Sequence, residues 1–321
     1  MTVYVLRRLA FLVASLLLAS VVLFLLLRLL PGDPANALTS VGATPEQLAA
    51  ARHQIGSDQP LPQQFVSWLH DLATFDLGNS FVSTLPVGPE IATRIEVTGP
   101  LTLMAFVLAL VIAVPVGFVA AHRANTWYGL VLSGVSQLGI AVPVFWVGMI
   151  LITVFSLHLG VLPAGGFPQD GWSDPAGALR SLALPVVTVA LVMSASLIRY
   201  VRSATLDVLG SDYLRTARAL GSSFGGAIRR HGLRNGAVPV VAVLGIELAS
   251  TLLGAVVVET VFALPGLGSM LSQAVAQHDY PTIQGVLFVT TLTVLVIGFL
   301  ADLAQRLIDP RLRSTLTGGK P

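Results

Sequence analysis

The chain has 321 residues, of which 54% are hydrophobic and only 11% charged, and it contains no cysteine. Soluble domains carry about a quarter charged residues, so this composition excludes an ordinary soluble protein and indicates an integral membrane protein. The lack of cysteine also excludes a disulfide framework and a thiolate metal site. The formal net charge is +2, and the positions of the charges are more informative than their sum.

The first uncharged run, Leu9–Leu27, holds 19 residues, which is long enough to cross about 30 Å of hydrocarbon. A secretory signal has a shorter apolar core and a small-residue cleavage site, and "RLLPGDPAN" fits such a site poorly. We therefore expect residues 1–30 to form a retained first transmembrane helix.

Residues 31–96 are polar and mostly acidic, and we expect them to form a loop with short helices on the outer membrane surface. In "TPEQLAAARHQIG", Thr44 suits an N-cap and Pro45 suits the first helical position. A second helix is predicted in "QPLPQQFVSWLHDLATFDLG", where Phe65, Trp68 and Leu72 share one face with Leu69. This lobe is too small to be an independent domain.

Five further apolar stretches are long enough to span a membrane. They are Val97–Ala121, Tyr128–Leu159, Ser181–Ile198, Gly236–Ala263 and Pro281–Ala301. The sequence therefore predicts an all-α transmembrane fold of six helices, with a five-helix core over residues 97–309 and a tail over residues 310–321. Prolines within spans, such as Pro143, kink helices and free carbonyls that can line a path. Three glycines of the third span are expected at close helix contacts: Gly134, Gly139 and Gly148.

The basic residues predict the orientation. With the amino terminus in the cytoplasm, 14 of the 18 lysines and arginines fall in cytoplasmic segments, in agreement with the positive-inside rule. Six spans then place both termini on the cytoplasmic side.

Residues 211–235 form the longest highly charged stretch, with five arginines between two spans. Asp212 suits the start of a helix over "DYLRTARAL", and Gly221 suits its end in a left-handed conformation. Three interpretations are open: a topology-fixing loop, an anionic-lipid-binding helix, or a docking element for a soluble partner. The compact helical hairpin favours the third.

This stretch resembles the cytoplasmic EAA loop of ATP-binding-cassette importer permeases. Arg215, Thr216 and Ala217 occupy the three-residue head of that motif, and Gly221 occupies its glycine, while the first glutamate and the final proline of the motif are missing. The form "DYLRTARALG" followed by "RHGLRN" resembles the dipeptide, oligopeptide and nickel branch of the family. "LLRLLPGDPA", "DLGNSF" and "ETVFALPGLGSML" match the same branch in order, so the resemblance covers essentially the whole chain.

The resemblance implies a type I importer permease in a bacterial cytoplasmic membrane. Such a permease forms half of a translocation pathway, here for peptides. It implies a second permease subunit, two ATPase subunits that bind ATP and Mg, and an extracytoplasmic solute-binding protein. The chain itself is expected to bind no cofactor, metal or nucleic acid and to contact membrane lipid. The hairpin at 211–235 would couple it to an ATPase through Tyr213, Leu214, Arg215, Thr216, Ala217, Arg218 and Gly221.

Three other functions are alternatives to this one. A related importer for nickel, glutathione or another small solute would have a similar permease. A stand-alone secondary transporter would need a repeated half, and an intramembrane hydrolase would need a nucleophile and base. The sequence shows no repeat, no such pair and no P-loop, so we expect no catalytic site of the chain's own.

Two carboxylates within the fifth apolar stretch are functional candidates because charge is costly in a membrane. Glu259, near the outer end, is expected either to act as a gate or substrate contact or to anchor a loop and reach interfacial water. Glu247 is expected either to face a cavity, where it could meet a peptide's amino group, or to make a hydrogen bond inside the bundle. Pro143 is a third candidate for the pathway.

Overall fold

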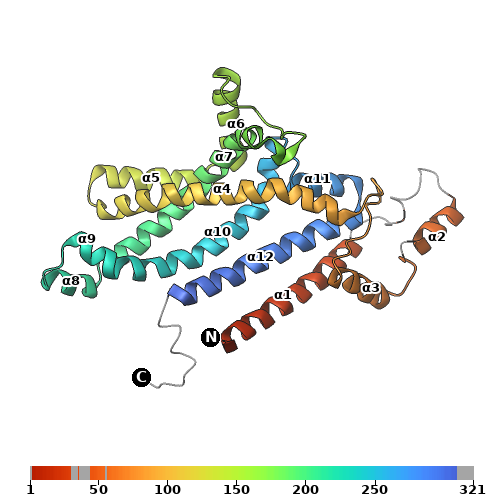
Figure 1. The fold of residues 1–321 in the computed structure, drawn as a ribbon, viewed down its shortest axis with the longest axis horizontal. Coiled ribbons are helices and arrows are strands. Elements are labelled where there is room, and N and C mark those ends of the chain that lie inside the picture. Colours follow the sequence, from red (N-terminus) through yellow and green to blue (C-terminus); the bar gives the residue numbers. More distant parts are fainter. Residues whose placement is uncertain (1, 30–34, 36–43, 55, 309–321) are drawn as a thin grey trace.

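The computed structural model describes residues 2–29, 35, 44–54 and 56–308, which fold almost entirely into helices (Figure 1). Outside the helices, one isolated β-bridge joins Asn79 to Pro86. The described part of the chain thus confirms the predicted all-α class. The tail at 310–321 and half of "LLRLLPGDPA" (residues 30–34) lie outside the described residues.

Five single helices are long and apolar enough to cross a membrane. They are α1 (Thr2–Leu29), α4 (Val87–His122), α7 (Pro175–Leu209), α10 (Leu233–Val261) and α12 (Tyr280–Ile308). α1 contacts α12, α12 contacts α10, α10 contacts α7, and α7 contacts α4. The first and last spans of the chain are therefore neighbours (Figure 1).

The third predicted span is not one straight helix. It consists of α5 (Trp127–Ala141), followed by α6 (Val144–Leu151) and the π-helix η2 (Ile152–His158), which continues α6. The axis of α5 and the axis of the α6–η2 segment differ by 102°. Pro143 lacks an amide hydrogen and forces the preceding residue toward an extended conformation, and Val142 has φ −82° and ψ 124°. The fold has six spans only if this bent pair is one of them.

Small residues let α4 and α7 lie close together. In the second half of α4, a buried alanine or glycine recurs at every fourth position: Ala105, Ala109, Ala113 and Gly117. A β-carbon at Gly117 would sit 2.8 Å from Val201 of α7. Helices without large side chains between them approach closely and gain dispersion contacts along their length.

The predicted glycine contacts are partly confirmed. A β-carbon at Gly139 would lie 2.8 Å from the Ala195 side chain, and one at Gly148 would lie 3.1 Å from Phe262. Gly134 has no such neighbour among the described residues, so the prediction is wrong there.

The lobe predicted to lie on the outer surface contains α2 (Pro45–Gln54) and α3 (Leu61–Ala73). Thr44 forms the predicted N-cap: its hydroxyl accepts from the Gln47 amide at 3.3 Å, and its own amide donates to the Gln47 side chain at 2.9 Å. Hydrogen bonds from its own amide and from Thr44 lower the pKa of Glu46. In α3, Phe65 packs edge-on against Phe24 of α1 and Trp68 packs against the same ring at a tilt, with ring centroids 5.3 and 5.8 Å from that of Phe24.

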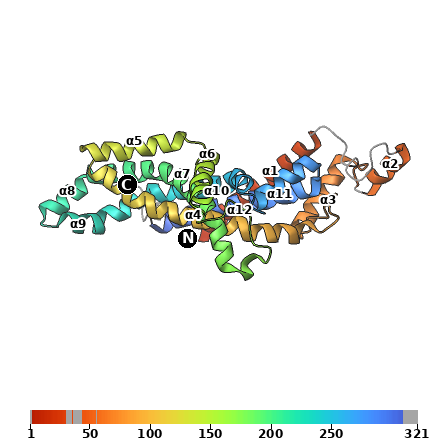
Figure 2. The ribbon, with the colours of Figure 1, turned by 90° about the horizontal axis from the view of Figure 1, so that it is seen from above.

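The opposite end of the bundle holds the start of α1 and the end of α12. Arg8 pairs with Asp302 at 2.9 Å, and Arg306, which is only 4% exposed, lies 3.8 Å above the Tyr4 ring. Both views place α8 (Asp212–Ala219) and α9 (Phe224–Ala227) toward this end and α2 at the other (Figures 1 and 2). The basic hairpin and the two terminal helix ends therefore share one side of the bundle.

Candidate functional site

The basic stretch folds as the predicted helical hairpin. After α7 ends, α8 runs over the "DYLRTARA" segment, α9 follows, and the π-helix η4 (Ile228–Gly232) leads into α10. Asp212 lies in the first turn of α8, where a negative charge is favourable. The hairpin thus begins two residues after α7 ends, and on its other side it continues through η4 directly into α10.

Gly221 ends α8 as predicted, in the left-handed region with φ +90°. Its amide donates to the Arg218 carbonyl at 3.0 Å, and the Ser222 amide donates to the Ala217 carbonyl at 3.1 Å. This pair of bonds is the Schellman motif. Glycine is favoured here because most other residues pay a conformational cost for a left-handed backbone.

The coupling residues expected from the resemblance lie on two faces of α8. Leu214 and Ala217 are buried with Ala227 of α9 in a small core of the hairpin, so they stabilise the hairpin and do not offer a contact surface. Tyr213, Arg215, Thr216, Arg218 and Gly221 are exposed. Leu220 was not predicted, yet its side chain is 83% exposed at the hairpin tip.

Aromatic contacts hold the hairpin against the bundle. The Phe224 ring of α9 lies 5.0 Å from His122 at the end of α4, and Arg218 lies 5.8 Å above the same Phe224 ring. The exposed Arg215–Asp212 pair at 3.2 Å adds little, because exposed ion pairs contribute at most about 1 kcal/mol. The hairpin is therefore fixed by packing at its base and leaves its tip open.

Glu259 is fully buried near the end of α10. Its Oε1 accepts from Thr98 of α4 at 2.6 Å, and its Oε2 accepts from the Gly268 and Ser269 amides at 2.7 and 3.0 Å. Those amides open α11 (Leu267–Gln277), and the Leu267 amide donates to the Thr98 hydroxyl at 2.8 Å. The carboxylate thus caps a helix whose dipole favours negative charge.

The expectation that Glu259 reaches interfacial water is wrong, because the first turn of α11 folds over its carboxylate. The geometry is that of the loop-anchoring alternative. A role as a gate stays a prediction, and it would require α11 to move.

Glu247 lies at the midpoint of α10 and is half-buried. Its Oε1 accepts from the Ser196 hydroxyl of α7 at 2.7 Å. It also lines a cavity of about 240 Å³ between α7, α10 and the junction of α5 with α6. Both alternatives for this residue are therefore present together: a hydrogen bond inside the bundle and a cavity-facing carboxylate.

Pro143 stands at the 102° bend and begins α6. Its carbonyl oxygen accepts hydrogen bonds from the Trp146 and Val147 amides at 3.0 and 3.3 Å. This oxygen therefore belongs to the hydrogen-bonded first turn of α6. Ile140 and Val144 on either side of the bend line the Glu247 cavity. Pro143 thus shapes one wall of that cavity through the backbone, and its place in a pathway stays a prediction.

Asp279 is a buried carboxylate that the sequence reasoning missed. Only 4% of it is exposed, and it accepts from the Ser80 hydroxyl at 2.6 Å, the Phe81 amide at 2.9 Å and the Thr282 hydroxyl at 2.7 Å. It therefore fastens "DLGNSF" to the start of α12. The signal was available: an aspartate two residues before Pro281 suits the N-cap of a helix.

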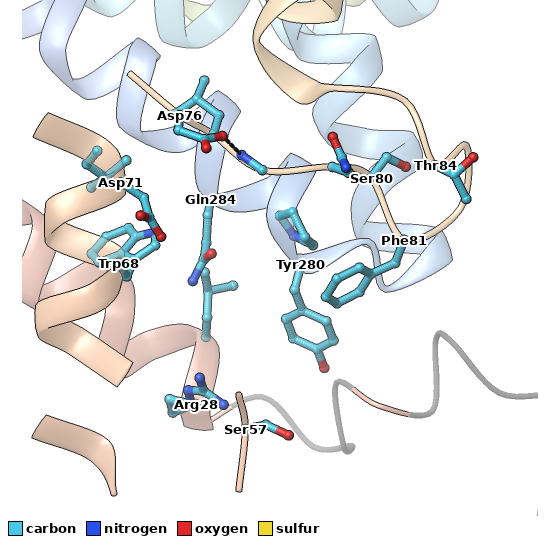
Figure 3. Close-up of a pocket in the computed structure, with 17 residues that line it drawn as sticks. Arg28, Ser57, Trp68, Asp71, Asp76, Ser80, Phe81, Thr84, Tyr280 and Gln284 are labelled. Carbon is cyan, nitrogen blue, oxygen red and sulfur yellow. Dashed lines mark hydrogen bonds between the residues drawn. The ribbon is translucent and has the colours of Figure 1, made fainter. Parts of the chain in front are cut away.

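A cavity of about 490 Å³ opens beside this junction, between the end of α1, α3 and the start of α12. Figure 3 shows Trp68 and Asp71 of α3 facing Gln284 of α12, with Arg28 below them. Asp76 accepts from the Gly78 amide at 3.0 Å and shapes the remaining wall. The lining carries both signs of charge next to aromatic rings, which suits a polar protein surface or ligand.

Within the described residues, no three His, Asp or Glu side chains are placed to hold a metal ion. The candidate functional features are the exposed hairpin tip at one end of the bundle, the cavity between α1, α3 and α12 at the other, and the Glu247 cavity between them.

The chain matches the family described as binding-protein-dependent transport system inner membrane component over residues 113–314, and the family's N-terminal part over residues 1–102. It is 38% identical over 313 residues to a protein of Sinorhizobium fredii (strain NBRC 101917 / NGR234) named "Probable peptide ABC transporter permease protein", covering 98% of this chain and all of that protein (100%). It is 37% identical over 310 residues to the glutathione transport system permease protein GsiC of Escherichia coli (strain K12), covering 97% and 98% of the two chains.

The fold is also similar to a solved structure of the MetNI methionine ABC transporter in an inward-facing conformation. The TM-score is 0.57 at 17% sequence identity, over 68% of this chain and 96% of that one. At this identity the likeness concerns the fold alone, and it agrees with the predicted type I importer permease architecture. The matches over the length of the sequence, together with the membrane-spanning bundle, show that this chain is a multi-pass membrane protein of the family of binding-protein-dependent transport system inner membrane components.

Proposed function

We propose that the chain is a permease subunit of an ATP-driven peptide importer and that the hairpin at 211–235 docks into an ATPase subunit. The names of the relatives, a peptide permease and a glutathione permease, support a peptide substrate because glutathione is itself a small peptide. In this proposal the partners are a second permease, two ATPase subunits that bind ATP and Mg, and an extracytoplasmic binding protein.

The exposed tip of the hairpin carries the proposal. Leu220 is 83% exposed and Tyr213 is 38% exposed, with Arg215 and Arg218 beside them. An exposed apolar side chain on a hairpin that also carries exposed arginines suits a cleft in another protein, where the apolar group is buried and the arginines steer association. A loop that served only to hold positive charge inside would need neither the Schellman turn nor the small core.

At the outer end, the lobe and the cavity of Figure 3 are proposed to receive the binding protein. In both overall views α2 lies away from the bundle (Figures 1 and 2). Deleting residues 44–56 should therefore weaken docking of the binding protein and leave the basal ATPase activity of the complex in place. Unchanged docking by an intact mutant complex would reject this part of the proposal.

The decisive test is to express the chain with the products of its neighbouring genes and purify it through a tag. We expect ATPase subunits and a second permease to co-purify. We also expect the complex to take up a labelled dipeptide only with ATP and the binding protein. A chain that is purified alone and transports solute without ATP would support the secondary-transporter alternative instead.

A further inference from the structure

We propose that Glu247 and the cavity beside it bind the protonated amino group of the peptide, so that the permease itself distinguishes peptides with a free amino end. This inference rests on the proposed peptide-import function. It adds a binding site of defined chemistry inside the membrane span.

Glu247 is a carboxylate at a position where an ionised side chain is energetically unfavourable. Glu247 lies at the middle of α10, a membrane-spanning helix, where an ionised side chain is expensive and usually marks a functional path. The ion pairs of the described residues lie elsewhere, and no lysine, arginine or histidine lines its cavity. A bound cation would supply the missing charge.

A structural role does not account for the charge. Ser196 donates to Oε1 at 2.7 Å, whereas Oε2 accepts no hydrogen bond from any residue that the structure describes. A neutral glutamine in the same position could accept the Ser196 bond without the cost of a buried charge. The second oxygen is thus left for a ligand in the cavity.

The cavity suits an ammonium group attached to a small apolar body. Its polar groups lie on α7 and α10 and comprise Ser196, Glu247, Ser250 and Thr251, while the remaining lining is almost wholly aliphatic. An ammonium group has three donors and no acceptor, which matches carboxylate and hydroxyl oxygens. At about 240 Å³ the space is smaller than a typical pocket for a whole small molecule, so it holds one end of a peptide.

The cavity is also accessible. Ser250 and Gly254, two of its lining residues, are exposed on the surface of α10, so a ligand can enter without unfolding the helix. A metal ion is a poorer occupant, because one carboxylate and a few hydroxyls offer too few strong ligands and no acidic or histidine cluster lies within the described residues.

The absence of cysteine from the chain allows a direct assay of cavity occupancy. Gly254 lines the cavity, and a β-carbon there meets no atom within 4 Å, so Gly254→Cys is a suitable reporter. The purified complex carrying this reporter is treated with a maleimide in the presence of alanyl-alanine or N-acetyl-alanyl-alanine. The measured quantity is the peptide concentration that halves the labelling rate of this chain.

We expect alanyl-alanine to protect the cysteine at a concentration about tenfold lower than the acetylated peptide, as for the loss of one ion pair of about 1.4 kcal/mol. Glu247→Gln should remove this difference, and Glu247→Asp should keep most of it. Ser194→Ala is the matched control: it lies on α7, bonds the Leu191 carbonyl of its own helix and lies outside the cavity. It should leave protection unchanged.

Equal protection by the two peptides in the parent complex would overturn the inference, and this comparison needs no stable Glu247 variant. Undiminished protection in an assembled Glu247→Gln complex would overturn it as well. ATP-dependent uptake of labelled dialanine by the parent complex separates the two proposals. Uptake without any difference in protection rejects only this site, whereas a complex that takes up no peptide rejects the proposed function.

Discussion

Replacing Gly221 with glutamate tests whether the hairpin tip couples the chain to an ATPase. Gly221 has φ +90°, and a β-carbon there would meet no atom within 4 Å. The cost within this chain is therefore confined to the backbone, at about 1–2 kcal/mol for a left-handed residue with a β-carbon. This amounts to a factor of about 5–30 in the population of the correctly closed turn.

The side chain adds a second effect only where a partner is present. Gly221 follows Leu220, which is 83% exposed, so a glutamate would place bulk and negative charge on the surface proposed to dock. Gly221→Asn, which tolerates the left-handed region, should retain coupling. Gly221→Ala should weaken it through strain alone, and Gly221→Glu should abolish ATP hydrolysis stimulated by the binding protein.

The assay compares ATPase-subunit retention and stimulated hydrolysis across purified complexes of equal yield. Gly160→Glu is the matched control, because Gly160 is also exposed, has φ +63° and has no neighbour for a β-carbon within 4 Å, yet it lies outside the hairpin. It should carry similar backbone strain and leave coupling intact. Full retention and normal stimulation with Gly221→Glu would refute the assignment, and lipid binding or topology would then better explain the hairpin.

The cysteine-free chain allows topology to be measured at two exposed sites, Val66→Cys and Leu220→Cys. Impermeant maleimide should label the first from outside the cell and the second only from the cytoplasm, and the reverse pattern would invert the orientation. Asp279→Ala should lower the thermal stability of the complex by the equivalent of about 1–3 kcal/mol for each buried donor that is left without an acceptor, and Asp279 has three such donors; exposed Asp170→Ala should shift it little. Glu259→Gln should cost about 1–3 kcal/mol by losing an acceptor for the α11 amides, and an unchanged melting temperature would show that the cap is dispensable.

Several features could be predicted from the sequence because they depend on local chemistry. The apolar runs mark the spans, since the length of uncharged sequence alone decides whether a helix can cross hydrocarbon. The Gly221 turn and the Thr44 cap were predictable for the same reason, because each joins residues only a few positions apart. The EAA-like spacing of the hairpin likewise lies within one short stretch.

Other features depend on which helices meet, and the tertiary structure alone decided them. Ser196 reaches Glu247 across 51 residues, and Thr98 reaches Glu259 across 161. Apolar patterning shows that each helix has a buried face, but it does not identify which helix packs against that face. The complete burial of Glu259 by α4 and α11 could therefore not be predicted. Pro143 permitted a kink, but the 102° bend exists because α6 packs against α7 and α10, and those contacts are made by residues far apart in the chain.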